Sequence, residues 1–234
     1  MELAFDYSYT PGAEPLKKVL VVSSHGNNII ALPQVFQQGW DTVKLTPGGT
    51  GNDIPGSLED FSQVPDGAFD AVFAPQNLKA LPAHRVIPAL GEMRRCLKEG
   101  GFLLASAPDL MKLAEFITQH RLEETLYESK IGPITPLDML FGPTALISQG
   151  VPHMEHRTGF TALTLGRKLK AAGFFNIQIY RKDLEVVAQG FNITDPNAKR
   201  EEKIAIHDPN QKDPNVLTDE LDVPPKEIDP EKRT

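Results

Sequence analysis

The sequence predicts an α/β fold in which a doubly wound, mainly parallel sheet carries helices on both faces. Two observations lead to this prediction. Short apolar or β-branched runs, each bounded by Gly, Pro, Asn or Asp, recur along the chain, and amphipathic stretches at helical spacing separate the later runs. With 234 residues and 40% hydrophobic side chains, the chain is also long enough to bury one substantial core.

The individual elements follow from these patterns. Apolar residues at helical spacing over 83–101, ended by two glycines, predict an amphipathic helix. A second helix is expected over 109–128, after Asp109 as a candidate N-cap, and a third over 161–174. The expected strands are 19–22, 42–45, 71–74, 101–107 and 175–180.

Composition divides the chain into three parts. Residues 1–16 are an N-terminal extension, 17–190 are expected to form the α/β domain, and 191–234 are a polar, acidic, Pro-rich C-terminal tail. Because the tail has few large apolar residues, burying them hardly offsets the entropy lost on ordering. We expect a tail that is disordered alone or draped over a surface, with short apolar runs able to dock to a protein partner.

Charge and cysteine content exclude several classes of protein. The formal net charge is −7 and the pI is about 5.4, which argues against a general positive field for nucleic acid or anionic lipid. Cys96 is the only cysteine, so an intrachain disulfide and a cysteine-rich zinc site are excluded. No stretch approaches the roughly 20 apolar residues that span a bilayer, and no signal-peptide pattern opens the sequence. We therefore expect a cytoplasmic protein that neither enters the membrane nor binds nucleic acid.

Three stretches resemble a known family. Residues 56–110, GSLEDFSQVPDGAFDAVFAPQNLKALPAHRVIPALGEMRRCLKEGGFLLASAPDL, resemble a segment of the class I S-adenosylmethionine-dependent methyltransferases. GPITPLDMLFG (132–142) and HMEHRTGFTALTLGRKLKAAGF (153–174) are similar to segments of a bacterial subgroup of predicted methyltransferases. The resemblance implies a Rossmann-like sheet, S-adenosylmethionine as cofactor, and methyl transfer to an acceptor that the sequence does not identify.

The resemblance also implies where the cofactor would bind. In the family, a glycine-rich turn after the first strand lets the backbone approach the amino-acid portion of the cofactor. Here Ser23, His25 and Gly26 stand at the glycine positions. The family's acidic residue at the end of the second strand accepts hydrogen bonds from the ribose hydroxyls, and Thr46 stands in its place.

Other positions carry over in the same way. Ser57 and Leu58 fall where the adenine would pack, and Pro75 falls in the loop after the fourth strand, which faces cofactor and substrate. The family's LEH after that loop is LKA here, residues 78–80. These departures cluster where the ligand would lie, so cofactor binding is expected to be weakened or lost, unless the PGGTG stretch at 47–51 offers backbone donors in compensation.

Candidate residues for catalysis or acceptor binding come from the retained TPLDMLFG and HRTGFT segments. They are Asp138, His156 and Arg157, and for each of them a structural role, through bonds to backbone and a neighbouring loop, is the alternative. His153 and His156 have a spacing that could put both imidazoles on one helical face. No further ligand is nominated, so no metal site is expected.

Two functions remain open from the sequence. One is methyl transfer from S-adenosylmethionine to a small-molecule or glycan-type acceptor. The other is a methyltransferase-fold protein without activity, a subunit or binding module that acts through protein partners by its C-terminal tail. The retained motifs favour the first, and the altered cofactor positions favour the second.

Overall fold

The computed structural model describes residues 17–22, 32–151, 154–195, 203–209 and 215–217. Within them lies a nine-stranded sheet of order β11-β10-β8-β9-β5-β4-β1-β2-β3, together with a separate hairpin. The strands of the large sheet are β1 (Lys17–Val22), β2 (Trp40–Thr46), β3 (Ile54–Pro55), β4 (Phe69–Ala74), β5 (Leu97–Pro108), β8 (Phe175–Lys182), β9 (Glu185–Phe191), β10 (Ile204–His207) and β11 (Asn215–Leu217).

The sheet is mainly parallel, as the sequence predicts. β1 pairs in parallel with β2 on one side and with β4 on the other, and β5 continues in parallel from β4. β9 runs antiparallel to both β5 and β8. The carboxyl ends of β1, β2, β4 and β5 therefore lie along one edge of the sheet, and the first residue of β9 lies at that same edge, opposite the end of β5. All five expected strands are confirmed, each with somewhat wider bounds.

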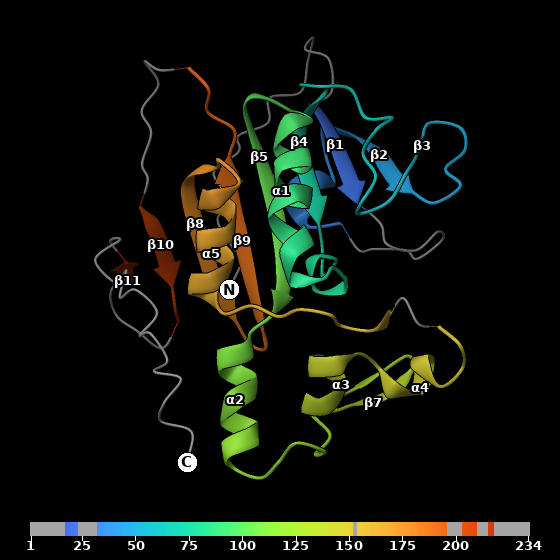
Figure 1. The fold of residues 1–234 in the computed structure, drawn as a ribbon, viewed down its shortest axis with the longest axis vertical. Coiled ribbons are helices and arrows are strands. Elements are labelled where there is room, and N and C mark those ends of the chain that lie inside the picture. The colour runs from blue at the N-terminus through green and yellow to red at the C-terminus, as the bar shows by residue number, and fades with distance from the viewer. Residues whose placement is uncertain (1–16, 23–31, 152–153, 196–202, 210–214, 218–234) are drawn as a thin grey trace, which may run out of the picture.

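The two helices that cover the sheet in the described residues, α1 (Val86–Arg95) and α5 (Ala162–Ala171), lie on the same face (Figure 1). Pro88 is tolerated because it lies in the first turn of α1, where its missing N–H needs no partner. The expected continuation of this helix through Leu97 to a stop at Gly100 and Gly101 is wrong, because Leu97 already pairs with Phe69 as the start of β5.

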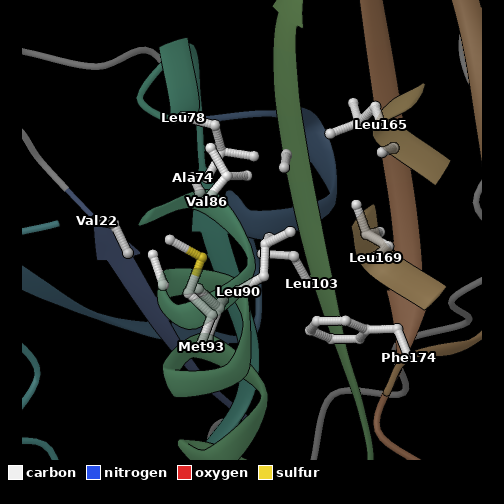
Figure 2. Packing of buried hydrophobic residues seen from close by; sticks show 14 of the residues in the cluster. Val22, Ala74, Leu78, Val86, Leu90, Met93, Leu103, Leu165, Leu169 and Phe174 are labelled. Atoms are coloured by element: carbon white, nitrogen blue, oxygen red, sulfur yellow. The ribbon is translucent and has the colours of Figure 1, made fainter. Parts of the chain in front are cut away.

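The main core lies between the sheet and these two helices. Figure 2 shows side chains from α1, α5, β4 and β5 in one continuous cluster, with Leu103 of β5 between Leu90 and Leu169. The opposite face of the sheet carries a second, aromatic cluster, in which the short 3₁₀ helix η1 (Gln34–Phe36) contributes Phe36. The ring of Phe36 contacts those of Trp40, Phe73 and Phe102 at centroid distances of 5.0, 5.6 and 6.0 Å.

Residues 110–160, called the insert below, connect β5 to α5. They form α2 (Leu110–Thr118), the hairpin of β6 (Tyr127–Ser129) and β7 (Gly132–Ile134), α3 (Pro136–Phe141) and α4 (Thr144–Ile147). Asp109 caps α2 as predicted, since its side chain accepts a hydrogen bond from the Met111 N–H. The expected continuation of this helix to residue 128 is wrong, because it ends at Thr118 and residues 127–129 form β6. Thr161 caps α5 through a capping box with Thr164. The insert lies beyond the carboxyl end of β5 (Figure 1), which is where ligands of open α/β sheets bind.

Part of the predicted tail belongs to the sheet. β10 pairs in parallel with β8, and β11 pairs antiparallel with β10. Ile204 and Ile206 are buried, and Ile204 packs closely against Gly166 of α5, where a Cβ would lie 2.6 Å from Ile204 Cγ2. Residues 204–207 therefore differ from the expected disordered or draped tail, while the division at 190 otherwise stays a prediction.

None of the described helices is long and apolar enough to cross a membrane.

Candidate functional site

The carboxyl edge of the sheet holds the point where the strand order reverses, between β1 and β4. Ligands of doubly wound sheets bind at this point. The loop after β4 is anchored here, because Asn77 is buried and its Nδ2 donates a hydrogen bond to the carbonyl of Val22, the last residue of β1. The neighbouring Gln76 has a left-handed backbone (φ 54°), which is uncommon for a residue other than glycine. Its N–H donates to the Ser106 carbonyl at 3.0 Å.

Thr46 ends β2 at the same edge. Its side chain is only 6% exposed, and its Oγ1 makes no hydrogen bond within the described residues. Its carbonyl, by contrast, accepts hydrogen bonds from the N–H groups of Gly49 and Gly56, at 3.1 and 3.2 Å. A buried hydroxyl without a partner costs roughly 1–3 kcal/mol. Thr46 therefore carries an unused polar atom at the position where the family resemblance implies contact with the ribose.

The predicted adenine-side residues occupy different environments. Ser57 forms a tight turn with Asp60, with backbone hydrogen bonds of 3.0 and 3.1 Å between the two residues. Leu58 is buried and belongs to the main core cluster, so its side chain packs against protein rather than lining an open surface. Pro75 directly follows β4 and is partly buried. The turn residues Ser23, His25 and Gly26 lie outside the described residues.

Asp138 forms a capping box with Thr135 at the start of α3, and both of its carboxylate oxygens accept hydrogen bonds. Oδ2 accepts hydrogen bonds from the Thr135 N–H and hydroxyl, at 3.0 and 2.7 Å, and Oδ1 accepts one from the Thr144 N–H at 2.9 Å. Partial burial acts to raise the pKa of Asp138, but the bonds from Thr144 and Thr135 outweigh it and the pKa lies below its usual value. These bonds fix the start of α3 and join it to α4.

His156 forms hydrogen bonds within the insert, and Arg157 joins the insert to the segment after β4. The Nδ1 of His156 bonds to the Met139 carbonyl at 2.9 Å, and its backbone N–H donates to Phe141. The N–H groups of Arg157 and Thr158 donate to the Lys79 carbonyl at 2.7 and 3.1 Å, while the Arg157 side chain is exposed. The alternative expected from the sequence, bonding to backbone and a neighbouring loop, is thus realised. His153 lies outside the described residues.

Two ionisable residues that sequence reasoning missed lie at this edge. Lys79 belongs to the 3₁₀ helix η2 (Leu78–Ala80) after the β4 loop, and Glu185 opens β9 opposite Pro108. Burial lowers the pKa of Lys79 to about 8, and the Glu185 carboxylate partly offsets this change. Burial raises the pKa of Glu185, and the Lys79 ammonium opposes that rise. The two charges are within electrostatic reach, and no ion pair of 4.0 Å or less joins these two described residues.

Neighbouring side chains complete this group, which we call the edge cluster: Lys79, Glu185, Gln76, Tyr127 and His156. Partial burial raises the pKa of Tyr127, and the Glu185 and Asp138 carboxylates add to the rise. The Gln76 amide lowers the pKa of Glu185, yet its Nε2 is buried without a well-formed hydrogen bond in the described part of the chain. The amide is therefore near the carboxylate but not aligned with it. Several perturbed groups at one sheet edge indicate a functional site.

The sequence held a signal for only one of the two missed charges. Lys79 occupies the middle of LKA, where the family resemblance has LEH, so a departure from the pattern marked it. Glu185 belongs to a strand that was not predicted, and nothing in its local sequence links it to the loop after β4.

His156 predicts a stability change with pH. Burial, aided by the Lys79 charge, lowers its pKa to about 4. In the unfolded chain the pKa is about 6.5, so between these values the unfolded state binds more protons and stability falls as pH falls. After allowance for partial exposure, we expect a loss of about 2 kcal/mol from pH 7 to pH 4. Urea unfolding across this range, compared with His156→Asn, measures it.

The Asn variant is the matched control because its amide can replace the Nδ1 donor but does not titrate. The difference in unfolding free energy between wild type and this variant should shrink as the pH falls. A constant difference from pH 7 to pH 4 would contradict the buried, neutral state of His156.

No group of three or more His, Cys, Asp or Glu side chains able to hold a metal ion is found in the ranges that the structure describes.

Comparison with known proteins gives one sequence match. Residues 43–105 match the family model described as a methyltransferase domain, and this range holds the second half of β2, β3, β4, α1 and most of β5. No curated protein matches the chain.

Solved structures resemble the chain remotely. A S-adenosylmethionine-dependent methyltransferase from Thermotoga maritima is 14% identical, covers 76% of this chain and 83% of its own, and has a TM-score of 0.47. One from Methanosarcina mazei is 15% identical, with 77% and 94% covered and a TM-score of 0.48. A methyltransferase from Burkholderia thailandensis with bound S-adenosylhomocysteine is 12% identical, with 76% and 71% covered and a TM-score of 0.46. The chain spans about half the length of several other matched structures.

These likenesses are too remote to indicate an acceptor. The sequence likeness lies in residues 43–105, which include the loop after β4 at the carboxyl edge of the sheet. Over these residues the chain is similar to a methyltransferase domain.

Proposed function

We propose that this protein transfers a methyl group from S-adenosylmethionine to a small-molecule or glycan-type acceptor bound beside the edge cluster. The observation that carries the proposal is the gathering of half-buried ionisable groups at the sheet edge next to the β4 loop. Keeping such groups away from water is costly, and their positions are typical of sites that bind or activate a ligand.

S-adenosylmethionine is the cofactor of this family, and the described residues fit it in part. The unpaired Thr46 hydroxyl supplies one hydrogen bond where the family has a carboxylate. Asn77 fixes the loop after β4 to the end of β1, at the point where the strand order reverses. A hydroxyl makes a single, neutral bond instead of a charged pair, so we propose weakened but retained binding.

The residues of the insert support an acceptor position between the sheet edge and residues 127–157. Arg157 and Thr158 bind the Lys79 carbonyl, so the insert is joined directly to the β4 side of the sheet. In methyl transfer, much of the rate comes from aligning the nucleophile with the methyl carbon and its leaving group. A fixed insert over the sheet edge serves this alignment.

Thr46→Val predicts opposite effects on stability and on cofactor affinity. Removing an unpaired buried hydroxyl should leave the free energy of unfolding unchanged or raise it by about 1 kcal/mol. Losing the hydrogen bond to the cofactor should weaken S-adenosylhomocysteine binding by about five- to tenfold. Urea unfolding and isothermal calorimetry measure the two quantities on the same preparation.

Thr42→Val on the same strand is the control, since Thr42 lies several residues before the carboxyl edge. It should leave the affinity unchanged. If Thr46→Val bound S-adenosylhomocysteine as tightly as the wild type, Thr46 would not contact the ribose.

A further inference from the structure

Lys79 and Glu185 form an unusual pair of charges in this fold. Each is half-buried and each senses the charge of the other, yet they form no direct ion pair. An ion pair made for stability closes to hydrogen-bond distance, as Lys98 and Asp70 do at 2.9 Å. Lys79 follows β4 and Glu185 opens β9, so the two residues flank the end of β5 at the edge of the sheet where ligands bind.

Both residues stand on well-fixed backbone. The Lys79 carbonyl accepts two hydrogen bonds from the insert, and η2 is joined to β1 through Asn77 at its start. Glu185 is the first residue of the β9 ladder, in register with Pro108 on β5 and Lys182 on β8. The backbones of the two residues are therefore fixed on opposite sides of the end of β5, without an ion pair between their side chains.

We propose that the acceptor is a hydroxyl compound whose oxygen binds between the Lys79 ammonium and the Glu185 carboxylate, with Glu185 as its proton acceptor. This proposal rests on the proposed methyl transfer. The Lys79 ammonium attracts an oxygen that is gaining negative charge, whereas a neutral amine gains positive charge as it is methylated and is disfavoured beside the ammonium. The pair therefore selects hydroxyl over amine nucleophiles.

Atoms and charges balance in the proton transfer from the acceptor to Glu185. The O–H bond of the acceptor breaks, its electron pair stays on oxygen, and the proton binds the Glu185 carboxylate. S-adenosylmethionine supplies the methyl group to that oxygen and leaves as neutral S-adenosylhomocysteine. The raised pKa of Glu185 makes it a better proton acceptor than an exposed carboxylate, and the lowered pKa of Lys79 still leaves it mostly charged at neutral pH.

The first test uses two probes of the same shape, p-nitrophenol and p-nitroaniline, in the presence of saturating S-adenosylhomocysteine. The wild type should bind the phenol about tenfold more tightly than the aniline and raise its phenolate absorbance at fixed pH. In Lys79→Met both the preference and the absorbance change should disappear. Lys112→Met, which removes a lysine paired with Glu115 on α2, should keep both.

The second test follows the proton. Calorimetry of p-nitrophenol binding in two buffers of different ionisation enthalpy reports protons released to solution. Below the pKa of the free probe, the wild type should release almost none, because Glu185 takes the proton. Glu185→Gln should release the proton to the buffer instead. A merely structural role for Glu185 would leave proton release unchanged.

Each outcome decides the matter. Any one of four results would overturn the proposal. The first two are equal affinity for the two probes and a preference that survives Lys79→Met. The other two are unchanged proton release in Glu185→Gln and no binding of p-nitrophenol to the wild type. S-adenosylhomocysteine binding, measured on all variants, separates this failure from failure of the proposed function. If the wild type binds S-adenosylhomocysteine but not the phenol, only the assignment of Lys79 and Glu185 is lost.

Discussion

Replacing Arg181 with methionine should lower the free energy of unfolding by about 3 kcal/mol. Arg181 on β8 bridges two buried carboxylates: its Nε donates to Asp109 at 2.7 Å and its Nη1 to Asp208 at 2.6 Å. The Asp109 side chain is only 2% exposed and that of Asp208 only 8%. Removing the cation takes two charged hydrogen bonds away from these buried carboxylates. Urea unfolding followed by circular dichroism measures the loss.

Two further variants sharpen this test. Arg85→Met removes an arginine from an exposed ion pair with Glu59 and should change stability by less than about 0.5 kcal/mol. Asp208→Asn, added to Arg181→Met, should recover part of the loss because it removes one of the two buried negative charges that Arg181 contacts. Equal effects of the Arg181 and Arg85 variants would contradict the bridge between the β5 end and the segment after β10.

Replacing Leu103 with alanine should cost about 3 kcal/mol. Leu103 is fully buried in the middle of β5, between the side chains of α1 and those of α5 (Figure 2). The neighbouring strands β4 and β9 hold its backbone in place, so the cavity left by the missing methyl groups has little freedom to collapse. Thermal and urea unfolding measure the loss.

Ile87→Ala is the matched control, since Ile87 on α1 is 39% exposed and loses less contact on truncation. Its cost should remain below about 1 kcal/mol. A Leu103→Ala protein as stable as Ile87→Ala would contradict the core described between the sheet and the two helices.

The sheet could be predicted because its central strands are read from local composition. β1 is buried on both faces and appears in the sequence as an unbroken apolar run, Val19 to Val22. β9 could not be predicted, because its position depends on pairing with β5, which is distant in the chain, and its turn from β8 uses Asp183 in a left-handed conformation instead of an Asn-Gly pair. β10 could not be predicted for a similar reason, because its two isoleucines pack against α5 only after folding.

Residues of the candidate site could be predicted only where they fall within a sequence motif of the family that the chain resembles. Thr46 was identified because an acid is expected at the end of the second strand, and its unpaired hydroxyl is consistent with a ligand-facing role. Asp138 and His156 were identified from retained motifs, and their hydrogen bonds now account for much of that retention. Glu185 comes near Lys79 because β9 returns antiparallel to the sheet edge. The local sequence of neither residue predicts this proximity.

The measurement that most directly tests the central claim is isothermal calorimetry of the wild-type protein with S-adenosylhomocysteine. The account predicts saturable binding to one site per chain, with a dissociation constant of about 10 μM, weaker than a site with the full carboxylate contact. Absence of heat up to roughly millimolar ligand, with binding gained by His25→Gly/Thr46→Asp, would contradict it and identify a fold that has lost its cofactor.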